Sequence, residues 1–197
     1  MSNAAPTTPT PALVRRATRD ESAAIARVIR EGFQSVADSV GRDIPPLHET
    51  ATDVEETFDA GDVVLVAESD GHIVGTVRAE GLEGGGVMAR RLAVLPEARG
   101  HGIARSLMRA LEDSYPDAQR FELFTGAMAT GPIALYESLG YKLVEPRGHG
   151  LPARLVREVP LGAQLSRVGS PATRARSAPD WHPRSASLRP PSATRPA

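Results

Sequence analysis

The segment best suited to bind a ligand is a glycine-containing loop between a predicted strand and a predicted helix. Its sequence is Leu92-Ala93-Val94-Leu95-Pro96-Glu97-Ala98-Arg99-Gly100-His101-Gly102-Ile103-Ala104. The first backbone N–H groups of a helix have no intrahelical acceptor, and the helix dipole places partial positive charge beside them. Glycine at two of these positions allows backbone conformations that other residues avoid. The loop therefore predicts a binding site for an anion such as phosphate or diphosphate.

Two common phosphate-binding motifs do not match this loop. The Walker motif requires a lysine after its second glycine, and the only lysine of the chain is Lys142. The dinucleotide motif requires a third glycine, but Arg105 occupies that position. The loop instead has the pattern Arg99-x-x-Gly102-x-Ala104. In this pattern the chain resembles the GNAT superfamily of N-acetyltransferases, whose members bind the diphosphate of coenzyme A with such a loop.

A second motif supports the resemblance about thirty residues further on. A helix is predicted to begin at Thr130, a candidate cap, with Pro132 in its first turn, and to end at Gly140. Its sequence Ala134-Leu135-Tyr136-Glu137-Ser138-Leu139-Gly140-Tyr141 is similar to the second half of the GNAT signature, Leu-Tyr-Glu-x-x-Gly-Phe/Tyr. Both motifs occur in the order that the family uses.

The resemblance implies transfer of an acetyl group from acetyl-CoA to an amine without a covalent enzyme intermediate. No metal is expected, because the histidines outside the loop (His48, His72, His149 and His182) lie in unrelated segments without metal-ligand spacing. It implies that the diphosphate is bound by backbone N–H groups of the loop, with Arg99 adding charge, and the loop residues concerned are Gly100, His101, Gly102, Ile103 and Ala104. It implies that main-chain groups of the preceding strand, at Leu92, Ala93 and Val94, pair with the pantetheine arm and polarise the thioester carbonyl.

Tyr136 is the expected general acid. A phenol has a pKa near 10, close to that of the coenzyme A thiolate, so it can donate a proton as the thiolate departs. The resemblance implies this role for the tyrosine at this position of the helix. The alternative is a core tyrosine, because helical spacing from Ile133 places Tyr136 on the inner face of the helix.

No residue is assigned as the general base. Several family members carry a glutamate early in the strand before the loop, where this chain has Gly84-Gly85-Gly86-Val87-Met88-Ala89. Glu80, Glu83 and Glu122 are candidates, but each is expected to be a solvated surface carboxylate. Glu31 is a candidate for holding a cationic substrate. Many members also have an asparagine where this chain has Ala129.

The acceptor is expected to be bound by two segments, residues 33–58 and 147–154. Arg90 and Arg91 are adjacent on a predicted strand, so they should point to opposite faces, one toward the acceptor groove and the other in an ion pair. An acidic domain favours cationic amines. A small-molecule amine is the preferred acceptor class, and a peptide amine is the second. Neither nucleic acid nor a membrane is expected as a partner, and the chain could form a homodimer.

Composition predicts one domain with a basic tail. The chain has 197 residues, 41% hydrophobic residues and no cysteine, which excludes disulfides and thiolate catalysis. Residues 163–197 contain six arginines and one acid, so they carry +5 and leave −6 on residues 1–162. We expect disorder at 1–11 and 162–197, with the acetyltransferase domain at 12–161. With neither an apolar span nor a signal segment evident, a cytoplasmic location is expected.

The hydrophobic pattern predicts the elements that position these residues. Strands are expected at 12–17, 63–68, 72–79, 87–95, 121–125, 141–145 and 154–159. Helices are expected after Thr18 or Asp20, near 50–58, after the glycine loop and after Thr130. The expected fold is α/β (α+β), the GNAT fold, with a mixed, mostly antiparallel sheet of six to seven strands flanked by about four helices.

Two other functions remain open at this level. A protein with this fold could bind acyl-CoA without turnover, as a sensing or interaction module, and the missing base and asparagine favour that alternative. A nucleotide-binding protein is disfavoured because neither phosphate motif fits.

Overall fold

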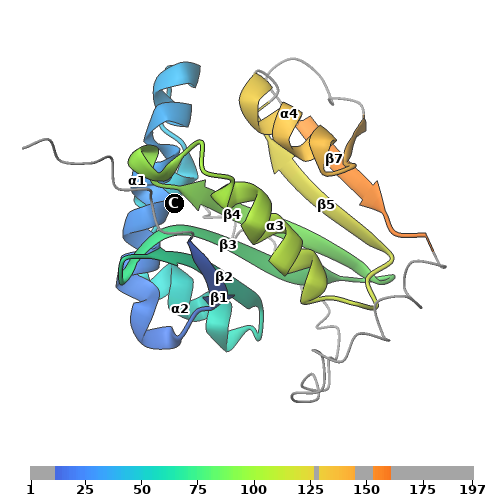
Figure 1. Ribbon diagram of the computed structural model, residues 1–197, viewed down its shortest axis with the longest axis horizontal. Coiled ribbons are helices and arrows are strands. Elements are labelled where there is room, and N and C mark those ends of the chain that lie inside the picture. Colours follow the sequence, from blue (N-terminus) through green and yellow to red (C-terminus); the bar gives the residue numbers. More distant parts are fainter. Residues whose placement is uncertain (1–11, 127–128, 145–152, 161–197) are drawn as a thin grey trace, which may run out of the picture.

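A seven-stranded sheet forms the centre of the computed structural model, which describes residues 12–126, 129–144 and 153–160 (Figure 1). The strands are β1 (Leu13–Arg16), β2 (Val63–Ser69), β3 (His72–Leu82), β4 (Gly86–Val94), β5 (Arg120–Thr125), β6 (Lys142–Val144) and β7 (Ala153–Glu158). Their order in the sheet is β1-β2-β3-β4-β5-β7-β6. Every neighbouring pair is antiparallel except β4 and β5, which are parallel. The predicted mixed sheet is confirmed.

Four α-helices in the described residues cover the two faces of this sheet. They are α1 (Ser22–Val40), α2 (Ala51–Asp59), α3 (Ile103–Asp113) and α4 (Thr130–Ser138), accompanied by short 3-10 turns η1 (Arg19–Glu21), η2 (Pro45–His48) and η3 (Pro96–Ala98). One apolar core joins α3 and Tyr136 of α4 to one face of the sheet, and a second joins α1 and Val54 of α2 to the other face. Figure 1 shows α3 lying across the strands, with α4 beside β5.

The hairpin between β2 and β3 forms where the Asp70-Gly71 pair predicts it. Both residues have positive φ, 50° and 75°, as a two-residue turn of the mirror-image type requires. The turn sets the register of the pair, so that alternate residues of β2 enter the two cores: Leu65 packs toward α3 and Val66 toward α1.

A β-bulge at Arg91 interrupts the pairing of β4 with β3. Thr76 pairs with Ala93 but Arg78 pairs with Arg90, so Arg91 is an extra residue, and its φ is 55°. The expectation that Arg90 and Arg91 point to opposite faces is therefore wrong. The pleat would have put them on opposite faces, but the bulge turns both side chains to the face that carries α2, where each forms an ion pair with a glutamate.

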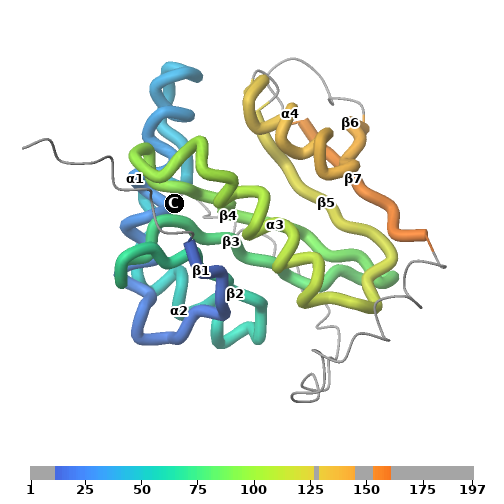
Figure 2. Tube along the Cα trace, in the orientation of Figure 1, coloured from blue at the N-terminus to red at the C-terminus, as the bar shows by residue number. Residues whose placement is uncertain are grey.

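Strands β4 and β5 are paired over only part of their length. The parallel register runs from Gly86 with Arg120 to Ala89 with Leu123, and β4 continues to Val94 without that partner. The two strands start side by side and then diverge, with β4 leading toward the start of α3 and β5 toward α4 (Figures 1 and 2). This divergence leaves one edge of β4 open beside the glycine loop.

Local capping differs from expectation at two helices. Thr18 precedes the turn η1, where its N–H donates to Glu21 (2.8 Å), and α1 itself starts at Ser22. Thr130 does not cap α4: it is the first helical residue, and Ala129 holds the cap position without a side-chain hydrogen bond. The expected disordered ends, 1–11 and 162–197, and most of the acceptor segment 147–154 lie outside the described residues.

Candidate functional site

The start of α3 presents a run of backbone N–H groups without acceptors. Gly100 and Gly102 have φ values of 82° and 76°, and Gly102 occupies the cap position. The first N–H that finds an acceptor belongs to Ser106, which donates to the Gly102 carbonyl (3.0 Å). Among the described residues, the N–H groups of 100–105 have no acceptor. Residues 100–102 are exposed, so the loop has the free donors and positive dipole end that an anion site needs.

The side chain of Arg99 fixes this loop against α1. Its guanidinium donates to the carbonyl of Gly32 (2.8 Å) and to the hydroxyl of Ser35 (3.0 Å), and its Nε donates to the carbonyl of Val94 (3.2 Å). The side chain thus joins the loop, β4 and α1. The charge that Arg99 was expected to add to the anion site lies on the α1 side, and its contribution to binding stays a prediction.

The open edge of β4 carries the main-chain groups of Leu92 and Val94. Leu95 donates its N–H to Val74 of β3 (2.9 Å), and Thr76 pairs with Ala93. In an antiparallel ladder each residue directs both its N–H and its C=O toward one neighbouring strand, and the next residue directs them toward the opposite side. Ala93 and Leu95 therefore face β3, whereas Leu92 and Val94 face the side from which β5 has diverged. Of the three strand residues expected to contact a ligand, two have the required backbone direction.

Tyr136 lies in the core on the face of α4 that packs against the sheet. It is 8% exposed, and its ring meets that of Tyr141 edge to face with centroids 6.0 Å apart. Burial raises the pKa of its hydroxyl to about 12, so the phenol stays protonated at neutral pH. Its hydroxyl has no hydrogen-bond partner in the parts of the chain that the structure describes, which leaves the O–H available as a donor.

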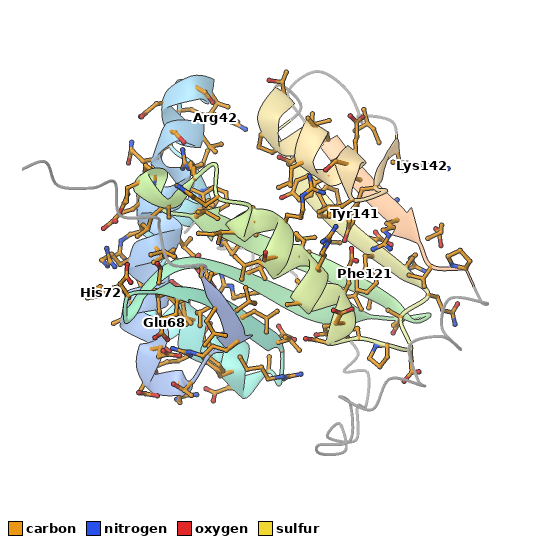
Figure 3. The ribbon with its side chains drawn as sticks, viewed as in Figure 1. Arg42, Glu68, His72, Phe121, Tyr141 and Lys142 are labelled. Atoms are coloured by element: carbon orange, nitrogen blue, oxygen red, sulfur yellow. The ribbon has the colours of Figure 1, made fainter. Side chains whose placement is uncertain are left out.

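A buried polar network holds the end of α4 against α3. The Tyr141 hydroxyl donates to Glu112 Oε1 (3.0 Å), and Arg157 of β7 pairs with the other oxygen of Glu112. The Tyr141 N–H donates to the Tyr136 carbonyl (3.0 Å), which ties this network to the candidate acid. Figure 3 shows Tyr141 between α3 and the α4–β6 region. Sequence reasoning missed Glu112, because an acid in the last turn of an amphipathic helix is usually solvated.

Two of the three carboxylates considered as bases, Glu80 and Glu122, are engaged in ion pairs, and Glu80 pairs with Arg90. Glu31, the candidate for holding a cationic substrate, pairs with Arg27 (3.2 Å). Glu122 is not the solvated carboxylate that was expected: its side chain is 5% exposed and bonds Arg120 and Arg154.

Burial alone would raise the pKa of Glu122, but the hydrogen bonds from Arg120 and Arg154 outweigh it and the net pKa is lowered. Glu83 is exposed. Within the described ranges, no group of three or more histidine, aspartate or glutamate side chains could hold a metal ion.

A cavity of about 740 Å³ opens on the α2 side of the bulge. Its walls come from η2, the start of α2, β3 and β4, and the lining residues are Asp43, Ile44, Pro45, His48, Glu49, Asp53, Glu56, Arg78 and Arg91. The buried carboxylate of Glu49 pairs with both arginines. Much of this cavity lies in the segment 33–58 where acceptor binding was expected, but neither Glu49 nor the bulge has a sequence signal that would have identified it.

Comparisons with known proteins find acetyltransferases among the relatives of this chain. Residues 60–143, which include β4, the loop, α3 and Tyr136, match the family model of the acetyltransferase (GNAT) domain. N-acetyltransferase 8 of Rattus norvegicus is 34% identical over 108 residues, covering 49% of this chain and 47% of that protein. This chain thus spans about half the length of that relative. Acetyltransferase ECA0875 of Pectobacterium atrosepticum is 33% identical over 103 residues, covering 51% of this chain and 72% of that protein.

The fold is also similar to solved structures. The PaiA N-acetyltransferase of Thermoplasma acidophilum, solved in complex with coenzyme A, superposes with a TM-score of 0.68 at 12% identity. The match covers 76% of this chain and 100% of that one. No helix of the described segments has the length and apolar character needed to cross a membrane.

Proposed function

Because the chain belongs to the GNAT family of acetyltransferases, we propose that it transfers an acetyl group from acetyl-CoA to a primary amine by direct attack of that amine. The observation that carries the proposal is the coincidence of two sets of free backbone donors. The N–H groups of residues 100–105 and those of Leu92 and Val94 border the same divergence of β4 from β5.

The first set suits the diphosphate. Six consecutive backbone N–H groups and the positive end of the α3 dipole can neutralise a diphosphate without a lysine, and the glycines leave open space around it. The second set suits the pantetheine arm, because an extended amide-containing chain can pair with a strand edge. Preorganised donors of this kind typically lower a barrier by about 3 kcal/mol when one of them meets the carbonyl oxygen.

Tyr136 supplies the proton that the departing thiolate takes up. As the neutral amine attacks the thioester carbon, the carbon–sulfur bond breaks and the Tyr136 hydroxyl donates to sulfur. A pKa of about 12 keeps this proton on the phenol until negative charge develops on sulfur. The amine must arrive neutral; its proton passes to solvent after the attack, and solvent returns a proton to the Tyr136 phenolate, which balances the step.

The cavity beside Arg91 indicates the class of acceptor. The open cavity beside Arg91 suits a small amine better than a folded protein surface, so small molecules come before peptides. Ion pairing of the candidate bases Glu80 and Glu122 favours a second candidate function, an acyl-CoA-binding module without turnover.

Turnover measurements on a tyrosine pair test the proposal. Coenzyme A release from acetyl-CoA is followed for a panel of amines with the wild type, Tyr136→Phe and Tyr115→Phe. Tyr115 is a matched control, because its pKa is also raised to about 12 but its hydroxyl donates to the Ala79 carbonyl (2.9 Å). We expect kcat to fall about 100-fold in Tyr136→Phe and to change little in Tyr115→Phe. Acetyl-CoA binding without transfer to any amine would establish the binding module instead.

A further inference from the structure

The cavity beside the bulge contains a guanidinium that is only partly used. Arg91 donates from Nε to Glu49 (2.8 Å) and lines the cavity with a side chain that is 31% exposed. Its two terminal nitrogens have no acceptor among the described residues. A guanidinium presents its donors in a planar fork, so these nitrogens retain the geometry that binds a carboxylate with two parallel hydrogen bonds.

The inner wall of the cavity holds two arginines against one buried glutamate, although the domain as a whole is acidic. Glu49, 3% exposed at its side chain, is shared by Arg78 and Arg91, so two guanidiniums face one carboxylate. Arg78 also donates from Nη1 to the Thr57 hydroxyl (2.8 Å) and to the Asp53 carbonyl (3.4 Å). Arg91 thus lines the cavity with two terminal nitrogens that have no acceptor in the described ranges, although the charge of Asp53 also acts on it.

The other acids of this cavity have different hydrogen-bond partners or are exposed, although the charge of Asp53 also acts on Arg78 and Arg91. Asp43 pairs with His48 on η2, and the Asp53 carboxylate accepts from the Thr50 N–H (2.8 Å) at the start of α2. Glu56 is exposed on α2. An anionic group that enters the cavity would thus find open donors at the terminal nitrogens of Arg91, whereas the acids Asp43 and Glu56 also line the cavity.

The bulge places this guanidinium beside the reaction centre of the proposed function. Arg91 immediately precedes Leu92, whose backbone groups face the divergence of β4 and β5. Without the bulge the pleat would turn Arg91 to the α3 face. The guanidinium and the main-chain groups of Leu92 therefore belong to adjacent residues, and a small acceptor held by Arg91 would be bound next to the strand that is proposed to hold the thioester carbonyl.

We propose that the acceptor is an amine that carries a carboxylate close to its amino group, as an α-amino acid does, and that Arg91 binds this carboxylate and determines specificity. The inference rests on the proposed function. It replaces the cationic acceptor that the net charge of the domain favours, because a contact inside the cavity acts at hydrogen-bond distance, whereas the charge of the whole domain is screened beyond about 8 Å at physiological ionic strength.

Matched acceptors and matched variants test the inference. The acceptors are α-amino acids, their amides and the amines that correspond to their decarboxylation, compared as kcat/KM for the neutral amine. The variants are Arg91→Gln, Arg91→Lys and the control Arg90→Gln. Arg90 is the neighbouring residue on the same face, but it pairs with Glu80 and does not line the cavity. Acetyl-CoA affinity and thermal melting are measured for every variant.

We expect the wild type to prefer the amino acid over its decarboxylated partner by about 10- to 100-fold, the range of a charged hydrogen-bonded contact. Arg91→Gln should abolish this preference mainly through KM, Arg91→Lys should retain part of it, and Arg90→Gln should retain all of it. Acetyl-CoA affinity should be the same in all four proteins. Arg91→Gln retains Arg78 as the partner of Glu49, so we expect it to fold.

Three results would overturn the inference. Equal or faster acetylation of the decarboxylated amines by the wild type would exclude the carboxylate contact and leave the proposed function intact. An unchanged preference in Arg91→Gln would assign the contact to another residue. If wild type binds acetyl-CoA but acetylates none of these acceptors, the inference fails, whereas absence of acetyl-CoA binding removes the proposed function as well.

Discussion

The contact between α1 and β4 gives a sharp test of how the site is positioned. Gly32 is buried in the middle of α1, and a Cβ added there would lie 3.0 Å from the Ala93 Cβ and 3.3 Å from the Val94 nitrogen. The neighbours are main-chain atoms and a Cβ, which cannot rotate away. The Gly32 carbonyl also accepts from Arg99 (2.8 Å), so displacement of α1 would disturb the loop.

The expected change for Gly32→Ala combines two opposing effects. Alanine in a helix is worth up to about 1 kcal/mol over glycine. Overpacking against a fixed backbone costs about 1 to 3 kcal/mol. The free energy of unfolding should therefore be unchanged or fall by about 2 kcal/mol, and acetyl-CoA affinity should fall because Arg99 and Val94 move.

Gly131→Ala is the matched control. Gly131 is an exposed residue of α4, and a Cβ there meets no atom within 4 Å. Only the helix effect applies, so this variant should gain up to about 1 kcal/mol. Urea unfolding of both variants measures the difference, expected at about 1 to 3 kcal/mol. Equal stabilisation by the two substitutions, with unchanged acetyl-CoA affinity in Gly32→Ala, would refute the close contact.

Three further predictions concern buried and titrating groups. Glu112→Gln should lower the free energy of unfolding by about 2 to 3 kcal/mol. The loss should be smaller than for a fully buried ion pair, because the Arg157 side chain is 26% exposed. A loss below about 1 kcal/mol in urea unfolding would contradict this prediction. Hydrogen bonding to Arg15 lowers the pKa of Glu21 to about 2. The ionised Glu21 carboxylate should therefore stabilise the folded protein fully above pH about 4.5, and this stabilisation should vanish as the pH falls toward 2. Melting temperatures of Glu21→Gln, measured over the same pH range, should lack that dependence. Because burial raises the Tyr136 pKa to about 12, the pH profile of kcat should show no loss of a phenol proton near pH 10, where an exposed tyrosine titrates.

The sequence predicts those features that depend on local pattern. Alternating and helical hydrophobic spacing locates the strands and helices, and the Asp70-Gly71 pair locates its hairpin, because these signals arise from neighbours in the chain. The anion site at the glycine loop also follows from local rules. The first N–H groups of any helix lack intrahelical acceptors, and α3 starts directly after Gly102. Inward placement of Tyr136 follows from helical spacing.

Features that depend on pairing between distant residues could not be predicted in this way. The bulge at Arg91 arises from a register shift against β3, and no residue type marks it. Glu122 has the same surroundings in sequence as an exposed strand acid, but the pairing of β5 with β7 brings Arg154 to it. The direction of the Arg99 side chain likewise depends on where α1 crosses β4.

A calorimetric titration with acetyl-CoA tests the central claim, that the loop at residues 99–104 binds the cofactor. The proteins are the wild type, Gly102→Asp and Gly61→Asp, because Gly61 has nearly the same φ, 79° against 76°, and open space at its Cβ. Acetyl-CoA at 100 times its Kd should also stabilise the wild type by about 2.7 kcal/mol. We predict binding by the wild type and Gly61→Asp and its loss in Gly102→Asp. Binding that survives in Gly102→Asp, or is absent from the wild type, would contradict the account.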